Sequence, residues 1–292
     1  MLSYIHAYHA GNFADILKHT VFSYTLEHLG KKDKPYTVID AHSAAGRYNL
    51  TDQRILKTHE AEKGIVELFK TDEKVLKEIF GDFFYTILKN YLNKKIYPGS
   101  PEISRCYLRK CDTLLLNELH PKVIEELKEN IRKPLLVEKT EEPNIYIKNE
   151  DASKFLKECI PPKIKRGCVI IDPSYEDKNE YEDTAKMVIN SLRKWSTPTY
   201  LIWYPLLVHR EDEIESMKKI IYDFVDVRKP GDEEKCYFFE IKIKAPSQMT
   251  GLAKMYGSGM IVINPPYGLK EKMNQTIPLI EKALCTNKPP LL

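Results

Sequence analysis

Two short stretches of this chain place a polar residue, proline and tyrosine directly after an apolar run. Asp-Pro-Ser-Tyr at 172–175 follows the apolar residues 169–171, and Asn-Pro-Pro-Tyr at 264–267 follows 260–263. An apolar run that ends in a polar residue is typical of a buried parallel strand whose last side chain faces a ligand. A carboxylate and a backbone carbonyl at such a place could accept the two hydrogens of an amine and help its nitrogen attack an electrophile.

The order of the strands favours the first of these two motifs. The predicted strands 236–243 and 259–265 are separated by too few residues for a crossover helix, so we expect them to be antiparallel neighbours. Ligands bind beyond the carboxyl ends of the parallel strands in a doubly wound sheet. The motif at 264–267 is therefore predicted to be a structural strand terminator at the opposite edge, and Asp172 is predicted to face the ligand.

Short apolar runs alternate with amphipathic segments along most of the chain, which predicts an α/β fold around a largely parallel sheet. The stretch 120–133, for example, places Val123, Ile124, Leu127 and Ile131 on one helical stripe. Stretches 181–195 and 213–224 have a similar helical pattern. Seven strands are predicted, at 36–41, 113–119, 144–150, 167–173, 199–205, 236–243 and 259–265.

One connection is too long for a simple link between a strand and a helix. Residues 51–96 contain apolar side chains at helical spacing, including Leu68, Phe80 and Leu88. We therefore predict an inserted helical subdomain at 51–96 and a main domain made of residues 1–50 and 97–292, with the first residues forming a cap.

Composition narrows the possible classes of protein. The chain has 292 residues, of which 42% are hydrophobic, and its 45 basic and 42 acidic side chains give a net charge of +3. The six cysteines form no C-x-x-C pair and no histidine cluster has zinc spacing, so no metal is expected. No run of about 18 apolar residues occurs, so we expect no membrane segment and a cytoplasmic location.

The stretch 38–48 is a predicted strand followed by a turn of small residues, a place where a nucleotide-like ligand meets the backbone. Gly46 is its one glycine, so the match to a dinucleotide motif is weak and a tight structural turn is an equal alternative. Glu118 ends the second strand, where such folds hold ribose hydroxyls, although a surface role is also open. The long spacing between this first loop and Glu118 is explained by the helical insertion at 51–96.

Two further strand ends have both a ligand role and a structural role. Asp151, followed by the small Ala152, could accept a hydrogen bond from the exocyclic amine of an adenine, or it could cap the helix that follows. Ser100 could contact a ligand or act as the N-cap of a helix with Pro101 in its first position.

In this order, the four strand ends are the parts of an S-adenosylmethionine-dependent amino-methyltransferase. The fourth part resembles the [DNS]-P-P-[YFW] motif of enzymes that methylate exocyclic amines. Asp172 and the carbonyl of Pro173 would then accept the amine hydrogens, and Tyr175 would stack on a flipped base.

A closer resemblance covers nearly the whole chain. With MLSYIHAYHAGNFADILKHTVF at 1–22, DAHSAAGRY, YPGSP, LNELHP, IDPSYE, LIWYP and GSGMIVINPP, the sequence resembles the bacterial 23S rRNA adenine N6-methyltransferase J family. The resemblance implies a Rossmann-like class I methyltransferase that uses S-adenosylmethionine to modify one adenine of naked or incompletely assembled 23S rRNA. The cofactor contacts that it implies are His19, His42, Ser100, Glu118, Asp151 and Ala152, with Asp172 as the catalytic acceptor. Lys18, Gly46 and Asp172 are also predicted to contact the cofactor, Lys18 near its carboxylate.

The first nineteen residues crowd polar and titratable groups more densely than the solubility of a helix requires. We interpret this segment as a cap over the cofactor and base pocket. The resemblance implies that Tyr4 reaches the RNA, and His6 beside it is also predicted to contact the RNA. A metal site from its three histidines is not expected, because their spacing is irregular. Lys89, Lys94 and Lys95, in a basic run, are predicted to contact RNA phosphates, although such runs are often solvated faces.

Two residues depart from the family pattern. Ala44 stands where the first loop usually has glycine, so its Cβ could crowd the cofactor or oppose a positive φ. Ser174 stands where a second proline is expected, which predicts a less preorganised loop and weakened catalysis. Two alternatives stay open: a DNA adenine N6-methyltransferase, or a catalytically impaired nucleic-acid-binding protein linked to use of external DNA.

Overall fold

A single mixed sheet of seven strands forms the centre of the molecule. The computed structural model describes residues 4–135, 142–228, 235–248 and 255–285. The strand order is β5-β4-β1-β6-β7-β9-β8, in which the first five strands are parallel and β9 is antiparallel to both β7 and β8. The strands are β1 (Thr37–Asp40), β4 (Thr113–Asn117), β5 (Asn144–Lys148), β6 (Gly167–Ile171), β7 (Thr199–Leu207), β8 (Cys236–Lys242) and β9 (Met255–Ile263).

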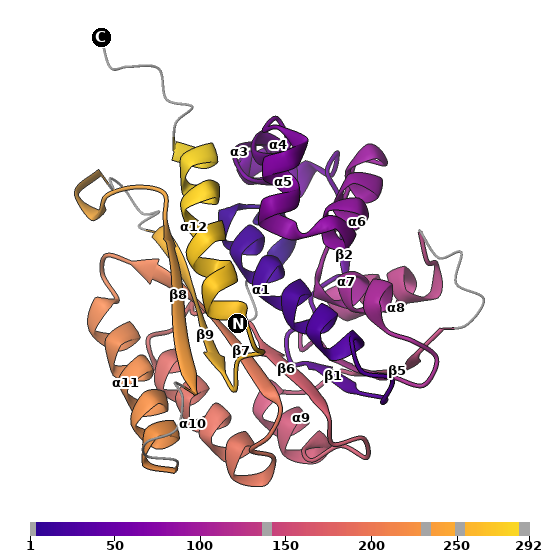
Figure 1. Cartoon of the computed structure of the whole chain (residues 1–292), viewed down its shortest axis with the longest axis vertical. Helices are drawn as coiled ribbons and strands as arrows, with labels where there is room; N and C mark the ends of the chain where they lie inside the picture. Colours follow the sequence, from indigo (N-terminus) through magenta and orange to yellow (C-terminus); the bar gives the residue numbers. More distant parts are fainter. Residues whose placement is uncertain (1–3, 136–141, 229–234, 249–254, 286–292) are drawn as a thin grey trace.

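Helices cover both faces of this sheet (Figure 1). On one face, α1 packs against β6, β7 and β9, while α12 packs beside it on β8. On the other face, α11 packs against β7 and α10 lies between α11 and α9. The helices are α1 (Phe13–Gly30), α7 (Ser100–Tyr107), α8 (Val123–Arg132), α9 (Ala152–Cys159), α10 (Asn179–Lys194), α11 (Glu211–Arg228) and α12 (Leu269–Cys285), with short 3-10 helices η1 (His6–Tyr8) and η2 (Pro246–Gln248).

The predicted α/β fold is confirmed, and each predicted strand lies in the sheet. The parallel central strands β1 and β6 are buried at every position, including the polar end residues Thr37 and Asp40 of β1. The antiparallel pairing of the last two strands is also confirmed. β9 begins at Met255, four residues before its predicted start, and residues 249–254 of the connection lie outside the described residues.

The predicted strand terminator at 264–267 lies at the edge opposite the carboxyl ends of the parallel strands. Asn264 has a φ of +51° and donates from Nδ2 to the carbonyls of Ser196 and Pro198, at 2.9 and 2.8 Å. The Asn264 side chain therefore fixes the end of β9 to the loop before β7, which confirms its structural role.

Residues 51–96 contain α2 (Gln53–Thr58), α3 (Glu60–Lys63), α4 (Ile65–Leu68), α5 (Glu73–Phe80) and α6 (Asp82–Asn93). These helices form the upper part of Figure 1, where α4 and α5 contact α12, and α5 also contacts α1. A short antiparallel pair, β2 (Arg47–Asn49) with β3 (Ile96–Pro98), joins the two ends of the segment. Their buried side chains belong to the same hydrophobic cluster as those of the sheet.

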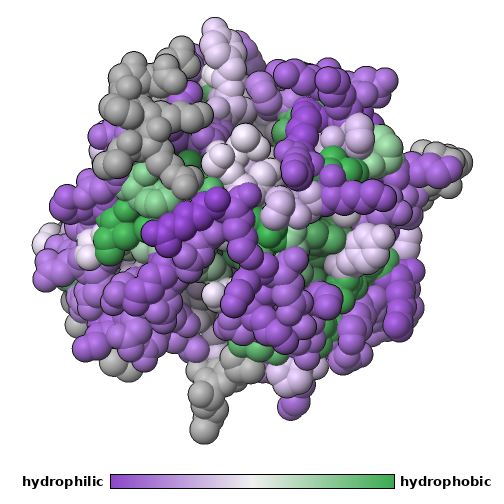
Figure 2. Space-filling model, turned by 90° about the horizontal axis from the view of Figure 1, so that it is seen from below, coloured by the Kyte–Doolittle hydropathy of each residue, from purple (hydrophilic) through white to green (hydrophobic). Residues whose placement is uncertain are grey.

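Two features of the outer surface complete the fold. None of the described helices is both long and apolar enough to cross a membrane. Figure 2 shows hydrophilic residues over most of the face that it presents, with smaller hydrophobic patches between them.

Candidate active site

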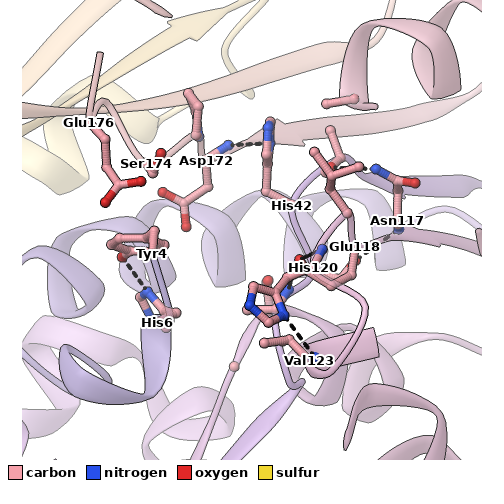
Figure 3. A pocket seen from close by; sticks show the side chains of 18 of the residues that line it. Tyr4, His6, His42, Asn117, Glu118, His120, Val123, Asp172, Ser174 and Glu176 are labelled. Atoms are coloured by element: carbon pink, nitrogen blue, oxygen red, sulfur yellow. Dashed lines mark hydrogen bonds between the residues drawn. The ribbon is translucent and has the colours of Figure 1, made fainter. Parts of the chain in front are cut away.

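A cavity of about 580 Å³ opens at the carboxyl ends of β1, β4, β5 and β6. This is the edge at which doubly wound sheets bind ligands, and the volume is in the range of small-molecule sites. Its walls come from four strand ends, from α1 and from the N-terminal segment (Figure 3). The predicted site residues that line it are Tyr4, His6, Lys18, His19, His42, Ser100, Glu118, Asp151, Ala152, Asp172 and Pro173.

Asn117, at the end of β4, joins three strand ends into one frame. Its Nδ2 donates to the carbonyls of Ala41 and Glu150, at 3.1 and 2.9 Å, and its Oδ1 accepts from the backbone N–H of Glu150 at 3.1 Å. The backbone of Asn117 also exchanges hydrogen bonds with Ser43. One buried amide therefore fixes the loops after β1, β4 and β5 against each other.

A buried ammonium group joins two carboxylates at the floor of the cavity. Lys18 Nζ lies 2.5 Å from Asp172 Oδ2 and 2.8 Å from Asp15 Oδ1. Burial alone would lower the pKa of Lys18, but Asp15 and Asp172 together raise it above its ordinary value. Burial likewise opposes the charge of Asp15, yet Lys18 and the nearby histidines hold the pKa of that carboxyl well below its usual range. Lys18 and Asp15 are therefore both charged at neutral pH.

The same network extends to the N-terminal segment. Asp15 Oδ2 accepts from the backbone N–H of Gly11 at 2.8 Å and lies 3.1 Å from His6 Nε2. The Tyr4 hydroxyl lies 2.9 Å from His6 Nδ1. Figure 3 shows Tyr4 and Asp172 facing the same part of the cavity. Burial, followed by the charges of Asp172 and Asp15, raises the pKa of Tyr4 well above its ordinary value, so its hydroxyl keeps its proton.

His42, after β1, is held as a neutral imidazole. Its Nδ1 accepts from the backbone N–H of Asp172 at 3.1 Å, which places the ring proton on Nε2. Burial lowers the pKa of His42 to about 4, so the ring stays neutral at physiological pH. This hydrogen bond connects the end of β1 to the backbone of the Asp172 loop.

Two more carboxylates organise the strand ends. Glu118 accepts from the backbone N–H groups of Ala44 and His120, at 2.9 and 2.7 Å, and burial raises its pKa. Asp40, the last residue of β1, is 1% exposed and accepts from Ser100 Oγ at 2.7 Å. Burial raises the pKa of Asp40 to about 7.

The predicted N-cap roles of Asp151 and Ser100 have different outcomes. Asp151 accepts from the backbone N–H of Lys154 at 3.1 Å, which confirms its role as the N-cap of α9. The prediction that Ser100 is an N-cap is wrong, because α7 begins at Ser100 and its N-cap is Gly99. The Ser100 hydroxyl bonds to Asp40 instead, so β1 and α7 are joined beside the cavity.

The comparisons with known proteins fit this arrangement. Residues 33–289 match the family model described as "Ribosomal RNA large subunit methyltransferase D, RlmJ". The chain is 33% identical over 287 residues to the "Ribosomal RNA large subunit methyltransferase J" of Escherichia coli (strain K12), and the match covers 97% of this chain and 94% of that protein. The chain belongs to the RlmJ family.

Two further proteins extend the comparison. The "Ribosomal RNA large subunit methyltransferase J" of Haemophilus influenzae (strain ATCC 51907 / DSM 11121 / KW20 / Rd) is 36% identical over 287 residues, covering 97% of this chain and 94% of that protein. The crystal structure of protein LPL1258 from Legionella pneumophila str. Philadelphia 1 has a TM-score of 0.79 and 29% identity, and the match covers 96% of each chain. The parallel order β5-β4-β1-β6-β7 with helices on both faces confirms the predicted Rossmann-like fold, and LPL1258 shares the overall fold of this chain.

One predicted role in this RlmJ-family site disagrees with the structure. Tyr175 is 4% exposed and does not line the cavity. Its φ of +52° turns the ring into the core, where it packs against Tyr181 and donates from its hydroxyl to the carbonyl of Trp203 at 2.9 Å. The prediction that Tyr175 stacks on a base is therefore corrected: the ring anchors the loop that carries Asp172.

Ser174, which stands where the family motif has a second proline, contacts the helix that follows it. The Ser174 hydroxyl lies 3.2 Å from a carboxylate oxygen of Glu180, in the first turn of α10. A proline at this position could not donate that hydrogen bond. The contact restrains the loop, which offsets part of the rigidity that a second proline would supply.

Gly46 and the three predicted RNA lysines lie outside the cavity lining. Gly46 has a φ of +80° and accepts from the backbone N–H of Gly99 at 2.9 Å, so the alternative of a tight structural turn holds. Lys89 lies 3.3 Å from Glu73, and Lys94 donates to the carbonyl of Leu135. Lys95 is exposed, and the RNA contact of these three lysines stays a prediction.

Sequence reasoning missed three residues that organise the RlmJ-family site: Asp15, Asp40 and Asn117. Asp40 and Asn117 each end an apolar strand, which is the same signal that pointed to Asp172. Asp15 lies in the crowded N-terminal segment, where its role depends on contacts with Lys18 and His6 that no local pattern predicts.

Proposed function

We propose that this chain transfers a methyl group from S-adenosylmethionine to the exocyclic N6 amine of one adenine in 23S rRNA. The observation that supports this most strongly is the position of Asp172. Its carboxylate faces the cavity at the end of β6, one oxygen is bound by Lys18, and its backbone N–H is bound by His42. Membership in the RlmJ family supports the choice of ribosomal RNA as substrate.

The chemistry of the cavity fits S-adenosylmethionine. The ligand carries a positive sulfonium and an ammonium group, and the cavity is rich in carboxylates. Glu118 and Asp151 stand at the ends of β4 and β5, where they would hold the ribose and the adenine, with Ala152 leaving room for the ring. His19, His42 and Ser100 complete this wall, and Lys18 would lie near the carboxylate of the ligand. When bound, the cofactor supplies an electrophilic methyl group.

Asp172 would act directly on the target amine. Lys18 bonds its Oδ2, while Oδ1 has no hydrogen-bond partner among the described residues. Oδ1 and the carbonyl of Pro173 would each accept one amine hydrogen, which shifts the nitrogen towards sp³ geometry as its lone pair turns to the methyl group. Lys18 and His42 hold the carboxylate and its backbone in place, and once the new N–C bond has formed, one amine proton would pass from the nitrogen to Asp172 Oδ1 or to solvent water.

Tyr4 is the aromatic residue placed to contact the target base. Its ring lines the cavity beside Asp172, whereas the ring of Tyr175 is buried behind it. Tyr4 stacks on the His9 ring at a centroid distance of 5.6 Å, and its hydroxyl contacts His6. We infer that the N-terminal segment closes over the flipped adenine through Tyr4, with stacking worth about 1–3 kcal/mol.

The rim of the cavity constrains how RNA approaches. Glu176, Asp177 and Glu180 line it near Asp172, so phosphates are repelled there and the base must enter alone. An unpaired or incompletely assembled RNA supplies such a base at the lowest energy. Lys89, Lys94 and Lys95 stay part of the proposal as phosphate contacts, and the cytoplasmic location follows from an rRNA substrate.

The test is methyl transfer from labelled S-adenosylmethionine to protein-free 23S rRNA, followed by digestion and identification of the labelled nucleoside. We expect N6-methyladenosine at one position, with assembled large subunits accepting less label. Label on another atom, or incorporation into duplex DNA in preference to RNA, would contradict the proposal.

A further inference from the structure

A second cavity, of about 290 Å³, lies at the edge of the sheet opposite the candidate active site. It is bounded by the start of β6 at Gly167, by the residues before β7 and by the turn that follows β9. Asn264 in that turn has a structural role, but Tyr267 does not share it, because its side chain is 92% exposed. Tyr24 donates to the carbonyl of Tyr267 at 3.1 Å, so the backbone is held while the ring projects outward.

Several lysines lie in the lining of this cavity or follow its lining residues closely in the sequence. Lys165 lines it, and Lys31, Lys32 and Lys34 follow the end of α1, whose His28 also lines it. None of these four lysines has a salt-bridge partner within the part of the chain that the structure describes. Asp33 lies among them and contacts Arg109 at 3.4 Å, so cations outnumber acids here.

The backbone that carries these lysines is fixed by two arginines. Arg109 donates to the carbonyls of Lys32 and Lys34, and Arg166 donates to those of Lys34 and Leu29. Both guanidinium groups also lie over the Tyr36 ring, at 5.7 and 5.6 Å. Burial, with the charges of Lys31, Lys32 and Arg166, lowers the pKa of His28, so these cations lie close enough to affect the same imidazole. The turn therefore presents its lysines on a rigid support.

Helix α1 connects this cavity to the candidate active site. Lys18 and His19 line the first cavity, and Thr25 and His28 line the second. At a rise of 1.5 Å per residue, the two ends of this stretch are about 10–15 Å apart along the helix axis. Because α1 is largely buried against α5, α7 and α12, an RNA strand that joins the two cavities must follow the outer surface over a longer path than this axial distance.

We propose that this second cavity is a binding site for a nucleotide of single-stranded RNA that flanks the target. Tyr267 would stack on the base, and Lys31, Lys32 and Lys165 would hold the neighbouring phosphates. These lysines would bind RNA phosphates, whereas the carboxylates at the rim of the first cavity repel them. This second-site proposal rests on the proposed function only because it assumes that RNA is the substrate.

The experiment measures binding of a labelled single-stranded RNA and of protein-free 23S rRNA to the full chain over a range of salt concentrations. Tyr267→Ala should raise Kd about tenfold, and Tyr267→Phe should restore it, because stacking needs only the ring. The triple variant K31Q/K32Q/K165Q should reduce the slope of log K against log salt by about 2, since each single-strand phosphate contact contributes about 0.7.

A matched triple variant, K186Q/K219Q/K244Q, removes three exposed lysines elsewhere and should leave the slope unchanged. Thermal unfolding of every variant excludes a folding defect. If Tyr267→Ala and the cavity triple variant bind RNA as the wild type does, the second site is overturned, whether or not methyl transfer occurs. If both weaken binding while no methylation is found, the second site stands and the proposed function fails.

Discussion

Ala44 adopts the left-handed backbone conformation that glycine usually occupies. Its φ is +46°, and its N–H donates to Glu118, so the strained turn is held by a hydrogen bond that organises the cavity. A residue with a Cβ is strained by about 1–2 kcal/mol in this backbone conformation. Glycine relieves that strain but loses more conformational entropy on folding, which offsets part of the gain in stability. Ala44→Gly should therefore stabilise the chain by up to about 1 kcal/mol.

Urea unfolding of Ala44→Gly measures this gain. Ala45→Gly is the matched control, because Ala45 is buried and is not among the described residues with positive φ. That control should lose stability. A loss of stability in both variants would show that the turn at Ala44 is not strained.

Asp40 should make the stability of the fold depend on pH. Its pKa is about 7 in the folded state, through burial, against an ordinary value of 3.8. The folded chain therefore holds this proton more tightly than the unfolded chain, so the stability contributed by Asp40 is greatest below about pH 4 and is lost as pH rises to about 7. The free energy of unfolding of Asp40→Asn relative to wild type should rise by about 2–3 kcal/mol between pH 5 and pH 8.

The measurement is urea unfolding of wild type and Asp40→Asn at several pH values. Using the difference between the two proteins removes the titration of all other groups. Parallel pH profiles would mean that Asp40 titrates in the folded chain near its ordinary pKa.

At the scale of elements, Asn117 fixes the ends of β1, β4 and β5 through three side-chain hydrogen bonds to backbone groups. Asn117→Ala leaves those groups without partners in a buried place. We expect a loss of about 2–4 kcal/mol of stability and weaker binding of S-adenosylmethionine, because the loops that form the cavity separate. Unfolding and calorimetric titration measure the two effects.

The control for Asn117 is Asn190→Ala, on the exposed face of α10. It should leave both quantities within experimental error. A full loss of stability with unchanged cofactor affinity would remove Asn117 from the positioning of the site.

The elements of the main sheet were predictable because each is a short segment built around two or more consecutive apolar residues and separated from the next by a helical or turn segment. β2 and β3 were missed because each has three residues, which is too short for a pattern, and β3 contains a proline. Most residues that line the cavity were predictable from the polar residues at the strand ends, because parallel strands bring their carboxyl ends together. The direction of the Tyr175 ring was not predictable, because it depends on the positive φ of Tyr175. Tyrosine does not favour a positive φ, so nothing in the sequence indicated it.

For the whole molecule, the helices at 51–96 share one hydrophobic cluster with the sheet. Phe84, on α6, is fully buried in that cluster, while both tryptophans of the chain, Trp195 and Trp203, lie in the main part. If the chain unfolds as one unit, Phe84→Ala should lower the stability reported by tryptophan fluorescence by about 3–5 kcal/mol.

Circular dichroism followed in the same samples provides the comparison for Phe84→Ala. The two signals should give one coincident transition. A fluorescence transition that stays at its wild-type midpoint, while part of the helical signal is lost earlier, would establish the inserted segment as an independent subdomain, as the sequence predicted.

The most direct test of the proposed function is the single-turnover rate of methyl transfer by Asp172→Asn at saturating S-adenosylmethionine and 23S rRNA. Loss of the carboxylate should lower the rate by about 10²–10⁴-fold while cofactor affinity changes little. Asp177→Asn, at the rim of the same cavity, should keep nearly the wild-type rate. A wild-type rate in Asp172→Asn would contradict the assignment of the reaction to this carboxylate.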